Sequence, residues 1–400
     1  MGLRLAAEDE AFRAEVRAFI RDNLPPDMAA RNCRGYHPSG QDMLAWTRIL
    51  NRCGWSGVHW PKEHGGTGWT PLQQHLFEEE CFLAGAPPQG VQGFTLVGPV
   101  IYTFGSEAQK QRFLPPILAG ESFWGQGFSE PNAGSDLASL KTRAVRDGER
   151  YIVNGQKIWT SEAQYADHLF CLVRTDPTVK PQRGLSFLLI DAKSPGLTIR
   201  PIISIDEAHS LNEVFFEDVS VPAENLVGEP GMGWTYAKFL LENERAFSAE
   251  VPRNKRNMAR LKAIARVERA GDLPLIEDPT FAIRLAELEV ELMALESATL
   301  QALAQKEREA DARPLGSILK IRGSELQQRL LELQVEALGD YAAVFYPEPE
   351  PDGGRNEAYP PGPDHAPGIM ADFLYRRAAT IYGGSNEIQR TIIAKQILGL

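Results

Sequence analysis

The stretch GMGWTYAKFLLENERAF (231–247) puts one carboxylate where a helix would bury it. If this stretch is helical, Trp234, Ala237, Leu241 and Glu244 recur at the spacing of an apolar stripe. A carboxylate on a buried stripe has a raised pKa unless it is paired, which suits a general base that works near neutral pH. A glutamate that pairs with an arginine of another helix gives the same pattern. Periodicity alone does not separate these two interpretations.

A second unusual stretch, IYGGSNEIQR (381–390), lies near the end of the chain. Gly383 and Gly384 allow a tight turn with positive φ, so a ligand can approach the backbone closely. Ser385 or Asn386 is suited to cap the helix that the following isoleucines predict. The turn itself carries no carboxylate, so it offers a binding surface without a catalytic base.

Two further stretches combine hydroxyl groups with permissive backbone. GFSEPNAGSD (127–136) offers N–H groups and the hydroxyls of Ser129 and Ser135 to a polar ring or a phosphate. An ordinary turn with Asx-type capping explains it equally. GQKIWTS (155–161) places hydroxyl residues after Trp159, whose indole is suited to lie against a planar cofactor. A tryptophan of the core is the other interpretation.

Composition restricts the classes of function. The chain has 400 residues, which is too long for one simple core, and it carries a formal net charge of −11 that disfavours nucleic acid as a partner. The four cysteines lie far apart, as expected of reduced thiols. The start MGLRLAAEDEAF lacks the apolar run of a signal peptide, and no stretch of about 18 apolar residues occurs. We expect a cytoplasmic protein.

Several common catalytic motifs are missing from the sequence. It contains no P-loop and no G-x-S-x-G elbow, and His59 and His64 do not form a His-Glu-x-x-His zinc motif. GQGF (125–128) begins like a dinucleotide fingerprint but lacks its third glycine and its βαβ context. We therefore expect neither a metal site nor a Rossmann cofactor site.

The periodicity of the chain predicts an α+β protein with three domains. Residues 1–120 have helical spacing, 121–233 have the period of strands in an antiparallel sheet, and 234–400 return to helical spacing. Within the strand region, Asn154-Gly155 predicts a tight hairpin. The Pro- and Gly-rich segment 346–368 is interpreted as a surface loop inserted into the second helical domain.

Together these stretches resemble the acyl-CoA dehydrogenase family over nearly the whole chain. The motifs WPKEHGG, FGSEAQKQRFLPPILAGE, SEPNAGSD, NGQKIWTS and IYGGSNEIQR occur in family order. Within the family, the chain looks most like the large subunit of bacterial pimeloyl-CoA dehydrogenases, which have separate large and small subunits. It implies an N-terminal helical domain, a central antiparallel β domain and a C-terminal four-helix bundle.

The resemblance also implies which residues act. Many members carry the base in the position that Gly383 occupies here, and others carry it on a bundle helix immediately before an arginine, as in Glu244-Arg245. This makes Glu244 the expected base, while Arg245 would contact the CoA portion and Gly383 would offer its N–H to the substrate carbonyl. The resemblance also implies that Ser135 contacts the substrate. The residues that the resemblance places around FAD are Gln126, Phe128, Ser129, Ser135, Trp159, Thr160, Ser161, Ser385 and Glu387.

The activity implied is flavin-dependent dehydrogenation of an acyl-CoA to a trans-2-enoyl-CoA, with an electron-transfer flavoprotein as acceptor. The region after the base lacks the Phe-Gly that commonly clamps the flavin pyrophosphate, and Glu336 and Asp340 stand where neutral residues are common. We therefore expect a smaller acyl-CoA-dehydrogenase-like subunit in an α2β2 assembly. A homodimer or homotetramer that uses Arg253 or Arg256 is the alternative. An acyl-CoA oxidase, a flavin monooxygenase and a supporting subunit are the rival functions.

Overall fold

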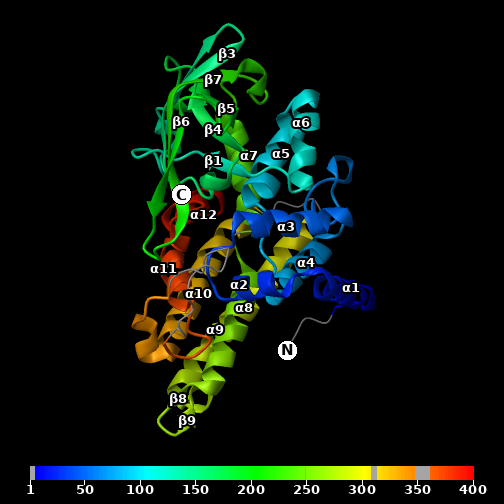
Figure 1. The fold of residues 1–400 in the computed structure, drawn as a ribbon, viewed down its shortest axis with the longest axis vertical. Coiled ribbons are helices and arrows are strands. Elements are labelled where there is room, and N and C mark those ends of the chain that lie inside the picture. The colour runs from blue at the N-terminus through cyan, green and yellow to red at the C-terminus, as the bar shows by residue number, and fades with distance from the viewer. Residues whose placement is uncertain (1–4, 248, 308–312, 347–360) are drawn as a thin grey trace.

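The computed structural model describes residues 5–247, 249–307, 313–346 and 361–400, without the side chains of 242–247, 306–307 and 313–314. A β-sheet forms one end of the molecule, and helices from both ends of the chain pack below and beside it (Figure 1). Most of the insert expected at 346–368 falls on residues 347–360, which lie outside this description.

The N-terminal part is helical, as its periodicity predicts. Its helices begin at polar caps: the side chains of Ser39, Thr70 and Ser106 each accept a backbone N–H of the first turn. Trp46 and Leu50 are buried in a core with Val16, Met28 and Phe77, which come from the first four α-helices. The helices are α1 (Ala7–Asn23), α2 (Pro26–Cys33), α3 (Gly40–Arg52), α4 (Pro71–Ala84), a π-helix (Gln92–Val97), α5 (Gly98–Phe104) and α6 (Glu107–Leu118).

The central part is a seven-stranded sheet in the order β1-β4-β2-β3-β7-β6, with β5 paired to β4. Most neighbours are antiparallel, as the strand pattern predicts, but β1 runs parallel to β4, with Trp124 opposite His168. The strands are β1 (Trp124–Gly127), β2 (Arg143–Asp147), β3 (Arg150–Lys157), β4 (His168–Arg174), β5 (Leu185–Asp191), β6 (Leu197–Ile203) and β7 (His209–Pro222).

The hairpin expected at Asn154-Gly155 is wrong. β3 continues through this pair, and the register against β7 shifts between Val153 and Gly155, so the pair forms a bulge. Asn154 exchanges hydrogen bonds of 2.9 Å with Asp218 across the two strands. Pairing on both sides of β3 therefore overrides the local turn preference. The tight turn lies between β2 and β3, at Gly148, whose φ is +58°.

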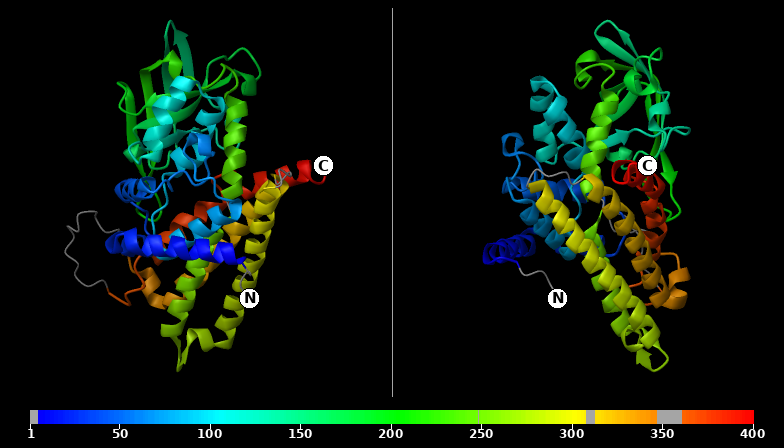
Figure 2. Two further views of the ribbon diagram at one scale, coloured as in Figure 1. Left: turned by 90° about the vertical axis from the view of Figure 1, so that its right-hand side faces the viewer. Right: turned by 180° about the vertical axis from the view of Figure 1, so that it is seen from behind.

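The C-terminal part begins with α7 (Gly233–Phe247), which runs from the face of the sheet down into the helical bundle (Figures 1 and 2). Ala237 and Leu240 of this helix are fully buried against the sheet side. The bundle continues with α8 (Val251–Val267), a short hairpin of β8 (Arg269–Ala270) and β9 (Leu273–Pro274), α9 (Pro279–Glu307), α10 (Arg313–Leu338), α11 (Ile369–Tyr375) and α12 (Asn386–Gln396).

The α+β class and the helical, β, helical order of the chain are thus confirmed. The domain limits at 120 and 233 stay predictions. Among the described residues, no helix is both long and apolar enough to cross a membrane.

The WPKEHGG segment supplies a test of the fold. A Cβ at Gly66 would meet the carbonyl oxygen of Trp60 at 1.6 Å, whereas a Cβ at Gly134 would meet no atom within 4 Å. Because backbone cannot yield as a side chain can, Gly66→Ala should lower the free energy of unfolding by about 3 kcal/mol, the upper end of overpacking effects. Urea denaturation measures it. Gly134→Ala is the control, and equal stability of the two variants would contradict the packing described.

Candidate active site

Two loops of the sheet domain, SEPNAGSD and the turn after β3, lie against each other. The backbone N–H of Ile158 donates to the carbonyl of Ser129 over 2.9 Å. The structure therefore brings together two stretches that the sequence singles out separately.

The turn after β3 exposes its tryptophan and buries its threonine. Trp159 has a φ of +61° and is 56% exposed, so the interpretation of Trp159 as a core residue is wrong. Thr160 is fully buried, and among the described residues its Oγ1 has no hydrogen-bond partner. The backbone of Thr160 is held on both sides: its N–H donates to the carbonyl of Asn212, whose side-chain amide donates to the Thr160 carbonyl.

The two-glycine turn adopts the conformation that its sequence predicts. Gly383 and Gly384 have φ angles of +64° and +81°. The side-chain amide of Gln389, on α12, donates to both glycine carbonyls, over 3.4 and 3.2 Å. Ser317 of α10 in turn donates to the side-chain oxygen of Gln389 over 2.8 Å. Two buried side chains therefore hold the turn in place. Ser385, not Asn386, caps α12, and its hydroxyl accepts the N–H of Ile388.

The expected base lies on α7, the helix that joins the sheet to the bundle. Residues 244 and 245 are helical, but the side chains of Glu244 and Arg245 lie outside the described part of the structure. The first turns of α7 pack against the core of the sheet domain, and its later turns approach α10. The position of the helix is therefore known, while the role of Glu244 stays a prediction.

The other residues that the resemblance implies differ in exposure. The ring of Phe128 packs edge-on against Phe170 and Phe187 in the core, which leaves only its backbone to face a ligand. Gln126, Ser129 and Ser161 are half-buried, and Ser135 and Glu387 are exposed.

These groups suit a flavin. A buried hydroxyl without a partner, an exposed indole beside it and a turn with accessible backbone are what a planar heterocycle with polar edges requires. α12, which follows the glycine turn, lies at the foot of the sheet (Figures 1 and 2). Thr160, Trp159 and Gly383 are the residues that would hold such a ring.

A polar cluster beside the glycine turn has no counterpart in the sequence interpretation. Glu250, which precedes α8 with a φ of +44°, pairs with Arg253 and accepts a hydrogen bond from Gln327 over 3.1 Å. Arg376 donates to the hydroxyl of Tyr382 over 3.0 Å. Burial raises the pKa of Glu250, but the charges of Arg253 and Arg376 and the bond from Gln327 outweigh it and lower this pKa to about 2. Glu250 and Arg253 have the i,i+3 spacing of a helical pair, but no spacing in the sequence links them to the other members of the cluster.

One group of side chains in the described part of the chain has the spacing of metal ligands, namely His75, Glu79 and Glu296. The ammonium of Lys255 lies 2.6 Å from a carboxylate oxygen of Glu79 and 2.7 Å from one of Glu296. A cation of the chain itself therefore already sits between these carboxylates.

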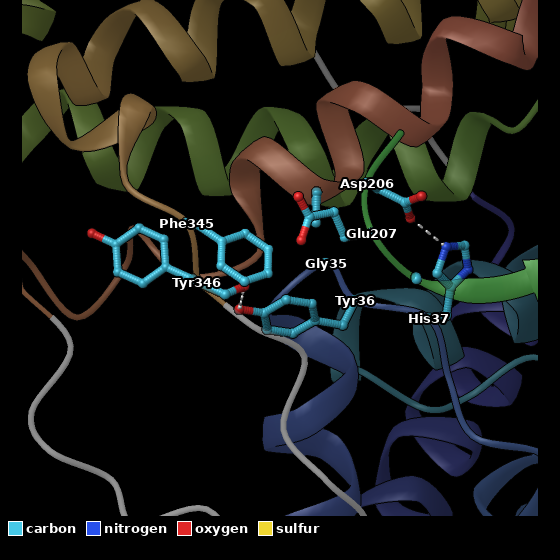
Figure 3. Close-up of a pocket in the computed structure, with 9 residues that line it drawn as sticks. Gly35, Tyr36, His37, Asp206, Glu207, Phe345 and Tyr346 are labelled. Atoms are coloured by element: carbon cyan, nitrogen blue, oxygen red, sulfur yellow. Dashed lines mark hydrogen bonds and ion pairs between the residues drawn. The ribbon is translucent and has the colours of Figure 1, made fainter. Parts of the chain in front are cut away.

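A small cavity lies where the three parts of the chain meet (Figure 3). It is bounded by the loop at Tyr36 and His37, by the β6–β7 turn and by Phe345 and Tyr346. Nε2 of His37 lies 2.9 Å from a carboxylate oxygen of Asp206, and the hydroxyl of Tyr36 donates to the Tyr346 carbonyl. None of the residues that the sequence singles out lines it, so we do not take it as the active site.

Family models and relatives agree over the full length of the chain. Residues 6–121, 125–219 and 231–398 match the N-terminal, middle and C-terminal domains of acyl-CoA dehydrogenases. The acyl-CoA dehydrogenases IpdE1 and FadE29 of Mycobacterium tuberculosis are 38% and 35% identical over 399 and 396 residues. Each comparison covers 98% of this chain and 97% of the relative.

Two solved structures have the same fold. A structure described as the Tcur3481-Tcur3483 steroid ACAD has a TM-score of 0.87 and 30% identity, and covers 100% of this chain and 99% of its own. The ChsE4-ChsE5 complex of Mycobacterium tuberculosis has a TM-score of 0.82 and 30% identity, with the same coverage. None of these four names mentions pimeloyl-CoA.

The Glu250 cluster predicts how stability depends on acid. Its pKa of about 2 in the folded chain lies below the value of about 4.3 for an unfolded glutamate. The pairing therefore stabilises the fold fully above about pH 5, and this contribution is lost as the pH falls toward about 2. Urea midpoints of the wild type and Glu250→Gln should differ at neutral pH and converge on acidification. A constant difference between the two proteins would contradict the ion pairing.

Proposed function

Because the chain belongs to the acyl-CoA dehydrogenase family, whose members are FAD-dependent oxidoreductases, we propose that it oxidises an acyl-CoA thioester to a trans-2-enoyl-CoA. The observation that carries this proposal is the unpartnered, fully buried hydroxyl of Thr160 beside the exposed Trp159. An unsatisfied buried hydroxyl costs free energy unless a ligand supplies its partner.

In the proposed reaction Glu244 removes the proton from the α carbon of the thioester. This C–H is a feeble acid, so the base must be aligned and the charge that develops on the carbonyl oxygen must be stabilised. The N–H of Gly383 is the donor we assign to that oxygen, which gives the glycine turn a role without a carboxylate. Bound FAD would accept the β hydrogen as hydride. Arg245 and Ser135 are proposed to contact the substrate.

Glu250 is a poorer candidate for the base than Glu244. Its carboxylate is paired with Arg253 and accepts from Gln327, and its pKa of about 2 leaves it weakly basic. Catalytic bases are most effective when their pKa lies near the working pH. This comparison argues against Glu250 as the base, while the assignment of Glu244 rests on its place in the sequence.

An acyl-CoA oxidase or flavin monooxygenase on the same scaffold is the second candidate function, and oxygen would replace the electron-transfer flavoprotein as acceptor. The rate at which the substrate-reduced protein is reoxidised in air separates the two. A supporting subunit without catalysis is the remaining candidate, and the presence of Glu244, of SEPNAGSD and of the Trp159 loop argues against it. We also propose that the protein is cytoplasmic, as its sequence leads us to expect.

The acyl group is proposed to be large or polar at its far end. The resemblance to pimeloyl-CoA dehydrogenase favours a dicarboxylyl chain, whereas a relative described as a steroid ACAD favours a steroid acyl group. We favour the steroid class, because that relative aligns over 100% of this chain. A panel of steroid, dicarboxylyl and straight-chain acyl-CoAs with an artificial electron acceptor decides, and highest kcat/KM for the dicarboxylyl thioester would overturn this preference.

A second subunit is proposed to hold the pyrophosphate of FAD. The arginines of the homomeric alternative are engaged within the chain: Arg253 pairs with Glu250, and the guanidinium groups of Arg253 and Arg256 lie 5.2 and 5.8 Å from the centre of the Phe82 ring. Glu336 is paired with Arg284 over 2.5 Å, and Asp340 is exposed. The complex described for ChsE4-ChsE5 supports a heteromer.

The region where many members carry Arg-x-x-Phe-Gly also differs. Here the segment after α8 turns back at Gly271 in a short β8–β9 hairpin. This hairpin lies at the end of the bundle opposite the sheet (Figure 1). We infer that a smaller acyl-CoA-dehydrogenase-like subunit supplies the nucleotide half of the site in an α2β2 assembly.

The base assignment predicts that Glu244→Gln keeps FAD and substrate binding while turnover falls at least about 100-fold, the scale of general-base loss. Steady-state kinetics with the preferred thioester measure this. Near-normal turnover would refute Glu244 as the base. In the companion variant Gly383→Glu on the Glu244→Gln background, recovered turnover indicates that both positions face one substrate.

The partner assignment predicts a colourless or flavin-poor protein when the chain is expressed alone, and a yellow, active complex when it is co-expressed with the small subunit. Absorbance of bound flavin and the mass of the assembly check both. Full flavin occupancy and full activity of the chain alone would overturn the heteromer in favour of a homomeric enzyme.

A further inference from the structure

A fully buried lysine lies directly behind the two loops of the sheet domain. Lys157 is the last residue of β3, and its side chain has no exposed surface. Its ammonium donates to the carbonyl of Phe128 over 3.0 Å and lies 2.8 Å from a carboxylate oxygen of Glu130. Since Ile158 donates to Ser129, three successive residues of the GFSEPNAGSD stretch are tied to the last residue of β3 and to the residue that follows it.

Glu130 is the second half of this connection. Its carboxylate accepts the backbone N–H groups of Lys141 and Thr142, over 2.6 and 2.8 Å. Its own backbone exchanges two hydrogen bonds of 3.0 Å with Ala133, which close the tip of the loop. The side chain of Glu130 thus ties the start of the loop to the segment that leads into β2.

Burial and pairing act in opposite directions on the pKa values of both groups. Burial lowers the pKa of Lys157, and the carboxylate of Glu130 opposes that effect. Burial raises the pKa of Glu130, but the ammonium and the two N–H donors outweigh it, so this pKa is lowered. The other ionisable groups that act on Lys157 are Cys171, whose buried thiol has a pKa raised to about 12, and Arg174.

A buried ion pair is a weak source of stability. The cost of removing two charges from water often cancels their attraction, so apolar residues of similar volume would stabilise the fold as well. What such residues cannot do is hold the carbonyl of Phe128 and two N–H groups in fixed places. The value of the pair therefore lies in geometry.

We propose that Lys157 and Glu130 are positioning residues, which set the relative placement of Ser129 and of the Trp159–Thr160 turn so that both face the flavin. This inference rests on the proposed function. It concerns residues that do not touch the cofactor and act through the two loops that do.

Lys157→Met tests the proposal, because it keeps the volume of the side chain and removes the ammonium. The full assembly is stripped of flavin and titrated with FAD, and its thermal unfolding and the visible spectrum of the bound flavin are recorded. We expect the dissociation constant for FAD to rise about 10- to 100-fold, as when partners that orient a binding group are removed. The flavin spectrum should shift as well.

Val153→Ala is the matched control, since Val153 is fully buried in the core on the same strand. It should lower the unfolding temperature while the FAD dissociation constant and spectrum stay those of the wild type. If Lys157→Met loses FAD affinity only to the degree that Val153→Ala does, the role is merely structural and the proposal is wrong.

Glu130→Asp serves if Lys157→Met does not fold. It keeps the charge, but its shorter side chain cannot reach Lys157 and both N–H groups together. Weakened FAD binding supports the proposal, and wild-type FAD binding overturns it. A wild-type assembly that binds no FAD would instead overturn the proposed function, so the two failures are distinguishable.

Discussion

The site depends on a constraint of backbone hydrogen bonding. The SEPNAGSD loop and the turn after β3 are irregular and partly buried, and unpaired peptide groups are costly where they are buried. The chain meets this demand with groups from elsewhere: Asn212 pairs with both sides of Thr160, and Ile158 pairs with Ser129. The hydroxyl of Thr160 is left without a partner among the described residues, in a loop whose backbone is otherwise held.

The same principle applies on the bundle side. The glycine turn requires two residues with positive φ, and its carbonyls are held by the buried amide of Gln389. Between the two halves runs α7, which is anchored in the core of the sheet domain at Ala237 and Leu240. A base on the last turns of this helix would thus be positioned by both parts of the molecule at once.

Much of this organisation could be predicted from the sequence, because it follows from local patterns. The change from helical to strand period and back predicts the α, β, α order, and residue type predicts a cap at Ser385 or Asn386, of which the structure uses Ser385. The bulge at Asn154-Gly155 could not be predicted, since it arises from pairing with a strand more than fifty residues away in the chain. The ion pair of Lys157 with Glu130 and the contact of Glu250 with Gln327 join residues far apart in the chain, so periodicity gives no signal for them. The exposure of Trp159 could not be predicted either, because it depends on a positive φ that the types of the neighbouring residues do not indicate.

The central claim is that the sheet loops and the glycine turn enclose one flavin, with the base on α7. An experimental structure of the flavin-loaded assembly with a bound acyl-CoA tests it most directly. The account predicts the flavin ring between Trp159 and the Gly383–Gly384 turn, with the Thr160 hydroxyl bonded to it and the Glu244 carboxylate facing the α carbon of the thioester. A flavin bound elsewhere, or a Glu244 side chain that points away from the substrate, would contradict it.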